Sequence, residues 1–92
     1  MHVTIHYFAQ VRQAAGVESE ELKLDDGSDV AAALSELAGR HGDGFRALVL
    51  DPQGAVRPSL VTLVNGAPIP HGQQPPLSDG DEISLLSAIA GG

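Results

Sequence analysis

Apolar and polar residues alternate along residues 2–7, and the same period of two recurs at 21–24, within the stretch 18–24, and at 82–85. A period of two places successive side chains on opposite faces, so each stretch predicts a β-strand with one buried face. The inward positions of these three strands are expected to be Val3, Ile5, Leu22, Leu24, Ile83 and Leu85.

The clearest helix signal lies in the middle of the chain, where the apolar period changes from two to about 3.6. Val30, Leu34 and Leu37 recur at helical spacing and predict an apolar stripe that packs on the strands. Ser28-Asp29 offers a side-chain cap for the first turn. Gly42 is a typical stop at the other end.

Three further segments complete the chain. Residues 8–16 favour a short helical turn, whereas residues 43–59 fit a strand or a helical fragment equally well. A β-branched run from residue 60 predicts a strand, and the following Asn65-Gly66 is the strongest two-residue hairpin signal. Pro68 limits the returning strand to a sheet edge, because proline has no N–H to donate. The order strand, strand, helix, strand, short strand, strand predicts one two-layer α+β domain over residues 1–92.

Composition narrows the class of protein. The formal charge is −7 and the five basic residues are scattered, which argues against nucleic acid as a partner. The absence of cysteine excludes disulfides, thiolate metal sites and a cysteine nucleophile. No apolar run approaches the ~20 residues that cross a bilayer, and no signal peptide is visible. We therefore expect a cytoplasmic protein without a membrane partner, whose acidic surface favours solubility or a basic docking face.

The chain offers little support for an active site of its own. It has no phosphate-binding loop, nucleotide-binding glycine pattern or nucleophile elbow. His2 and His6 share a strand face but lie about 13 Å apart, too far to hold one zinc ion. We interpret the four histidines as exposed or loop residues, and Asp79, Asp81 and Glu82 as residues that stabilise a tight turn. We therefore expect no resident metal or cofactor, and no autonomous catalysis.

Residues 87–92 differ from the rest of the chain, and we expect them to form a flexible C-terminal tail. Leu86 and Ile89 have no predicted core position, so we expect them to contact partner proteins. Gly91 and Gly92, with the small Ala90 before them, can enter a channel that is too narrow for other residues. The Gly92 carboxylate is ionised at neutral pH and is a weak electrophile, so another enzyme must activate it as an acyl-adenylate.

Several segments resemble the small ubiquitin-like sulfur carriers, a family that includes the molybdopterin synthase small subunit and the thiamine-pathway sulfur carrier. YFAQVRQAAG, at residues 7–16, resembles the opening of the molybdopterin synthase small subunit. The chain is similar to the family in general at LVNG (63–66), PLSDGDEISLL (76–86) and the terminal Gly91-Gly92. The resemblance implies the β-grasp (ubiquitin-like) fold, a mixed sheet of four or five strands packed on one main helix.

The resemblance also implies a function. A ubiquitin-activating-type adenylyltransferase would use ATP and magnesium to adenylate the Gly92 carboxylate. A sulfur donor protein would then convert the adenylate to a thiocarboxylate. An acceptor enzyme, such as the molybdopterin synthase large subunit, would take the sulfur while the tail occupies its active site.

The pathway and one alternative function stay open. Residues 7–16 favour molybdopterin synthesis, but Ser87-Ala88 stands where many molybdopterin-type tails have two prolines. The ending SAIAGG resembles the carriers of cysteine synthesis and tRNA thiolation more closely, and residues 43–59 exceed what the shortest members need. The alternative is a ubiquitin-like protein modifier, joined through Gly92 to lysines of target proteins.

Overall fold

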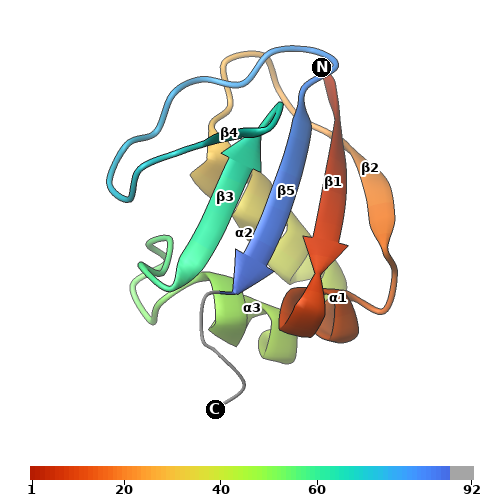
Figure 1. Cartoon of the computed structure of the whole chain (residues 1–92), viewed down its shortest axis with the longest axis vertical. Coiled ribbons are helices and arrows are strands. Elements are labelled where there is room, and N and C mark those ends of the chain that lie inside the picture. The colour runs from red at the N-terminus through yellow and green to blue at the C-terminus, as the bar shows by residue number, and fades with distance from the viewer. Residues whose placement is uncertain (88–92) are drawn as a thin grey trace.

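The computed structural model describes residues 1–87, which form a mixed five-stranded sheet and three helices (Figure 1). The sheet order is β2-β1-β5-β3-β4, with β5 parallel to β1 and antiparallel to β3. The α2 helix covers one face of the sheet, and α1 and α3 lie at the end where β1 and β5 finish (Figure 1). In chain order the elements are β1 (His2–Phe8), α1 (Ala9–Ala15), β2 (Ser19–Lys23), α2 (Val30–His41), α3 (Asp43–Val49), β3 (Leu60–Val64), β4 (Ala67–Pro68) and β5 (Glu82–Ser87).

The core lies between the sheet and the helices, and it confirms the predicted inward face. All six inward strand positions and the stripe Val30, Leu34 and Leu37 are buried in one hydrophobic cluster. Asp29 provides the cap of α2, because its side chain accepts a hydrogen bond from the Ala32 amide at 2.9 Å. Gly42 ends the helix with φ 93°, a conformation that favours glycine. The predicted α+β, β-grasp architecture is therefore correct.

The segment that the sequence left open between a strand and a helical fragment contains a third helix. The ambiguous segment after Gly42 begins with α3, which buries Phe45 and Val49 completely. The chain then makes a turn in which the Asp51 side chain accepts hydrogen bonds from two backbone amides, each at 2.9 Å. The side chains of this segment fill a part of the core that α2 alone does not fill.

The predicted hairpin is present between β3 and β4. Asn65 and Gly66 both have positive φ, at 52° and 84°, as a type I′ turn requires. Pro68 pairs opposite Leu63 on the edge strand β4, as its missing N–H predicted. None of the helices within residues 1–87 has the length and apolar character needed to cross a membrane.

Candidate functional site

The β5 strand lies at the centre of the sheet and brings the chain to its last residues. Its neighbour β1 pairs with it as far as Leu86, and β3 pairs with it as far as Ser87, which lies opposite Leu60. Leu85 is completely buried, whereas the next residue, Leu86, is 40% exposed. Leu86 is thus exposed as predicted, and its role in partner binding stays a prediction.

Leu86 belongs to an apolar row that crosses the exposed face of the sheet at the end of β5. It pairs with Phe8 of β1 on one side and with Val61 of β3 on the other. Directly paired side chains on neighbouring strands lie within contact distance, so the three form one continuous strip. Phe8 is 48% exposed, and Val61 is half-buried. We call Phe8, Leu86 and Val61 the apolar row.

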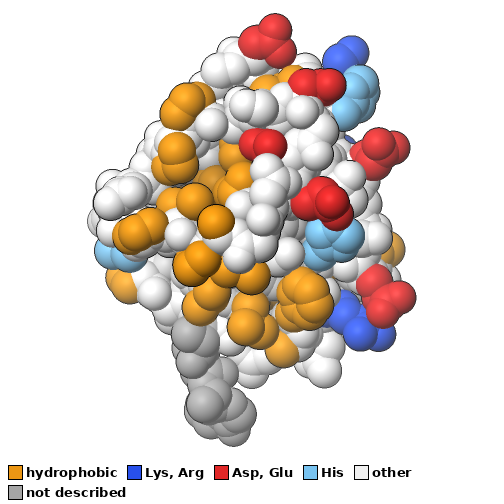
Figure 2. Space-filling model, turned by 45° about the horizontal axis from the view of Figure 1, so that its top comes forward, with side chains coloured by type: hydrophobic (Ala, Val, Ile, Leu, Met, Phe, Trp, Pro, Cys, Tyr) orange, Lys and Arg blue, Asp and Glu red, His pale blue; other side chains and the backbone are white. Residues whose placement is uncertain are grey.

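The rest of the exposed face has an apolar side and a polar side. Leu63 follows Val61 on the same face of β3 and extends the apolar area along that strand. Toward β1 and β2 the face is polar: His6 Nε2 lies 2.9 Å from Glu82 Oε1, and Glu21 is exposed. Figure 2 shows apolar side chains gathered on one side of this face and acidic and histidine side chains on the other. A partner that docks at the end of β5 would therefore meet an apolar surface bordered by acidic groups.

The other predicted site residues, Ile89, Ala90, Gly91 and Gly92, lie outside the described residues. Their predicted roles in docking, threading and acyl activation stay predictions. The predicted tail included Ser87, which the structure places at the last position of β5.

Phe8 is an exposed apolar residue that the sequence pattern does not identify. The pattern places it in the helical turn, but it continues the outward series of His2, Thr4 and His6 in β1. Ala9, immediately after it, has φ 51°, an unfavourable value for a residue other than glycine. This bend ends the strand and starts α1, and the alternation of β1, extended by one step, would have identified Phe8.

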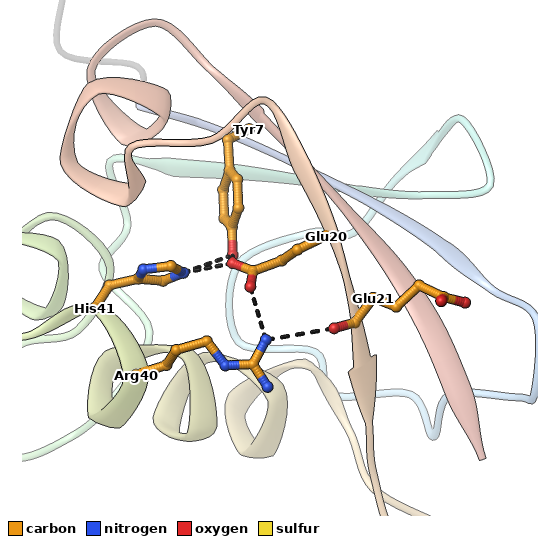
Figure 3. Close-up of polar contacts among 5 residues, drawn as sticks. All are labelled: Tyr7, Glu20, Glu21, Arg40 and His41. Atoms are coloured by element: carbon orange, nitrogen blue, oxygen red, sulfur yellow. Dashed lines mark hydrogen bonds and ion pairs between the residues drawn. The ribbon is translucent and has the colours of Figure 1, made fainter.

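A polar cluster ties β1 and β2 to the end of α2 (Figure 3). The Glu20 carboxylate accepts hydrogen bonds from the Tyr7 hydroxyl at 2.5 Å and from Arg40 at 2.7 Å. It also bonds to His41 Nε2. Arg40 bonds in addition to the backbone carbonyl of Glu21 at 3.4 Å, on the outer edge of β2. We call Tyr7, Glu20, Arg40 and His41 the Glu20 cluster.

The electrostatics of the Glu20 cluster favour a charged carboxylate and a neutral phenol. Burial alone would raise the pKa of Glu20, but hydrogen bonds from Tyr7, Arg40 and His41 outweigh it and hold that pKa below its usual value. Burial, reinforced by the hydrogen bond and charge of Glu20, raises the pKa of Tyr7 far above its usual value. The cluster is a fully bonded structural tie on the helix side of the sheet, away from the apolar row.

This cluster corrects the interpretation of His41 as an exposed or loop residue. Its side chain is only 12% exposed, and its ring packs against Tyr7 and Phe45. No spacing in the sequence signals this contact, because its partners come from three separate elements. Within residues 1–87, no three histidine or carboxylate side chains gather in a way that could hold a metal ion.

Asp79 and Asp81, on either side of Gly80, stabilise a turn as predicted, whereas the prediction is wrong for Glu82, which begins β5 and whose carboxylate pairs with His6 across the sheet. Asp79 accepts a hydrogen bond from the His2 amide at 2.7 Å, and Asp81 accepts one from the Ser78 amide at 2.8 Å. Asp81 also accepts from the Asn65 side chain at 2.9 Å, which joins this turn to the hairpin. These bonds account for both aspartates without a catalytic role.

A mixed sheet with two parallel central strands, packed on α2, defines the class of small ubiquitin-like β-grasp proteins. Within that class the chain belongs to the ThiS family, whose model matches residues 5–92. The family brings together ubiquitin-like sulfur carriers and protein modifiers, as the names of the relatives show.

Three relatives illustrate the range of the family. The chain is 31% identical to small archaeal modifier protein 3 of Haloferax volcanii, over 100% of both chains. It is 27% identical to the molybdopterin synthase sulfur carrier subunit of Chlamydomonas reinhardtii, again over 100% of both. The crystal structure of the modifier SAMP1 from Haloferax volcanii superposes with a TM-score of 0.85 and 25% identity, covering 100% of each chain.

Proposed function

We propose that this protein is a sulfur carrier that works in the cytoplasm through the carboxylate of Gly92. A ubiquitin-activating-type adenylyltransferase joins this carboxylate to AMP, using ATP and magnesium that the chain itself does not bind. A sulfur donor protein then replaces AMP with sulfur, and the resulting thiocarboxylate gives its sulfur to a precursor in an acceptor enzyme. The proposal is supported by the family membership, which extends through Gly92.

The observation that carries the proposal is the position of the apolar row at the end of β5. The five residues that follow Ser87 reach at most about 18 Å when extended. A partner that holds Gly92 in an active site must therefore place that site within this distance of the end of β5. The exposed Phe8 and Leu86 lie at that end of the strand, and exposed apolar groups favour protein docking.

Molybdopterin synthesis is the pathway that we propose first. The match to YFAQVRQAAG is longer than the match of the ending SAIAGG to the other carriers, and one relative over the full chain is a molybdopterin synthase sulfur carrier subunit. The acceptor would then be a molybdopterin synthase large subunit. Carriers for thiamine, cysteine or tRNA thiolation use the same terminal chemistry, so only the acceptor distinguishes these pathways.

Conjugation to proteins is the second candidate function. It is favoured by the 31% identity to a small archaeal modifier protein. In this case a lysine amine of a target, rather than a sulfur donor, attacks the activated carbonyl of Gly92. Both functions begin with the same adenylate, and they differ in the nucleophile that follows.

The first experiment tests the terminus. The purified chain, the activating enzyme of its source cell and ATP-Mg should release pyrophosphate, and a sulfur donor should then replace one carboxylate oxygen with sulfur, as intact mass would show. A chain with Gly92 deleted, or with a residue appended to it, should release none while its thermal unfolding stays unchanged. Normal thiocarboxylation of the extended chain would refute the proposal.

The second experiment tests the docking surface. Leu86→Asp should weaken binding to the activating enzyme, because it places a charge in the apolar row. Its stability should change by no more than about 0.5 kcal/mol, as for most exposed positions. Val17→Asp is a matched control, because Val17 is 44% exposed but lies between α1 and β2, outside the row. Equal binding losses for both variants would show that the row has no special role.

The third experiment identifies the acceptor. If the pathway is molybdopterin synthesis, the chain copurifies with a synthase large subunit, and the thiocarboxylated pair converts the sulfur-free pterin precursor. Support of cysteine, thiazole or thiolated-tRNA synthesis instead would reject this pathway and keep the sulfur carrier. Lysine conjugates without any thiocarboxylate would favour the modifier.

A further inference from the structure

Lys23 is the only lysine in the sequence. It is the last residue of β2, where it pairs with His2, and its side chain is exposed. Within residues 1–87 its ammonium group has no ion pair or hydrogen bond, although acidic residues outnumber basic ones by 12 to 5. The chain therefore presents one unpaired side-chain amine.

The amine of Met1 is the competing nucleophile, and the structure holds it in place. It donates a hydrogen bond to the Leu24 carbonyl at 2.8 Å and lies 3.4 Å from the Asp26 carboxylate. The Met1 side chain is only 3% exposed. An attack by this amine would require these contacts to break, whereas Lys23 needs no such rearrangement.

Lys23 also lies away from the apolar row. Along β1, the register places Lys23 beside His2 at one end and Leu86 beside Phe8 at the other. Six residues of strand separate the two ends, a distance of about 20 Å. A partner that covers the apolar row can therefore leave Lys23 accessible.

We propose that Lys23 is the acceptor through which one copy of this protein is joined to the Gly92 of another. The inference rests on the proposed activation of Gly92 and extends its second, modifier branch. ATP and the Gly92 carboxylate give the acyl-adenylate and pyrophosphate. The deprotonated Lys23 amine attacks the acyl carbon, a C–N bond forms, the C–O bond to AMP breaks, and AMP leaves with the electron pair. The surplus amine proton passes to solvent, so no oxidant or reductant is needed.

The acceptor belongs to a second molecule rather than to the same one. From the end of β5 to Lys23 the sheet spans about 25 Å, given seven residues along the strands and two strand spacings across. The five residues after Ser87 reach only about 18 Å. Ring closure would need them drawn straight across the exposed face, whereas a second copy has no such constraint. Because each copy has one Lys23 and one Gly92, the product is an unbranched chain with a single type of linkage.

The experiment combines the full-length chain, its activating enzyme and ATP-Mg, and follows covalent dimers by gel and intact mass. Cleavage after glutamate should yield a branched peptide, in which residues 22–36 of the acceptor hold residues 83–92 of the donor on Lys23. Lys23→Arg keeps the charge and should reduce the dimer to background while pyrophosphate release stays normal. As a matched control, Arg46→Lys is added to the Lys23→Arg variant, which places an exposed amine on α3 instead. Any dimer of this double variant should be linked through residue 46.

Each other outcome overturns the inference or the proposed function separately. A dimer that persists in Lys23→Arg would place the linkage at Met1 or at a hydroxyl. Pyrophosphate release without any dimer would reject Lys23 as an acceptor and leave the activation of Gly92 intact. If no pyrophosphate is released, the proposed function fails. A full-length chain prepared with a thioester at Gly92 then serves as the activated donor and tests the acceptor residue without the activating enzyme. Acylation of Met1 in preference to Lys23 by that donor would refute the inference.

Discussion

Replacement of Glu20 by glutamine should destabilise the protein more than any other removal of a single acidic charge from β2. Glutamine has nearly the same size, so packing is conserved and only the charge and one acceptor are lost. The carboxylate of Glu20 receives hydrogen bonds from Tyr7, Arg40 and His41. In Glu20→Gln the amide nitrogen would face at least one of these donors.

The magnitude follows from the exposure of each partner. A hydrogen bond to a charged group contributes a net free energy of about 1.5–3 kcal/mol to stability when it is shielded from water. The side chains of Glu20 and His41 are only 17% and 12% exposed. Arg40 is 46% exposed, so the ion pair between Arg40 and Glu20 contributes at the low end of the range for surface ion pairs. We expect a loss of about 2–3 kcal/mol at pH 7. In a domain of this size that lowers the melting temperature by about 10–20 °C.

The loss should depend on pH in a defined direction. The folded state lowers the pKa of Glu20 below its reference value of 4.5. A group with a lowered pKa stabilises the fold above its unfolded pKa, and this contribution is lost as the pH falls through the folded value. The difference between wild type and Glu20→Gln should therefore be full near pH 7 and should shrink below pH 4.5.

Thermal unfolding followed by circular dichroism, at a series of pH values from neutral to acid, measures this difference. Glu21→Gln is the matched control, because it removes the same charge from the next position of β2. The Glu21 side chain is exposed and has no hydrogen bond or ion pair within residues 1–87, so its loss should cost little. Equal losses for both variants would refute the argument. So would a loss for Glu20→Gln that stays constant under acid conditions.

Two further predictions concern the core and the phenol of the Glu20 cluster. Leu34→Ala should cost about 2–5 kcal/mol in denaturant unfolding, because Leu34 is 1% exposed at the centre of the α2 stripe; a near-zero cost would mean that the site collapses around the gap. Wild type should lose stability as the pH rises above 10.0, the reference pKa of tyrosine, since the folded state raises the pKa of Tyr7. Tyr7→Phe should lack this alkaline loss, and an identical loss in both proteins would assign it to other groups.

The sequence allowed the sheet and α2 to be predicted because their signals are local and repeated. Alternation identified the inward residues of β1, β2 and β5, and Asn65-Gly66 located the hairpin. Each signal comes from residues that are close in sequence, and the elements that the signals predict fit together in one fold. Agreement between local signals and the overall fold is what allows a sequence to specify one structure.

The parts that escaped prediction depend on contacts between distant residues. The seven residues of α3 are too few to show a period, and their helical state follows from the burial of Phe45 and Val49. In the Glu20 cluster, Glu20 bonds to residues that are 13 to 21 positions away, which no spacing rule connects. Phe8 sits at a strand end, where the period of two is interrupted by Ala9.

The alternation of β5 places a core residue directly beside an exposed apolar residue. Leu85 points into the core and is fully buried, while Leu86 points away and joins Phe8 and Val61 in the apolar row. Because β1 and β3 hold β5 on both sides, the row keeps its geometry independently of any partner. The Glu20 cluster fixes β2 to α2 on the opposite side of the sheet. The proposed binding of a partner at the end of β5 therefore requires no change in the core, and on this proposal the protein binds and leaves successive partners without refolding.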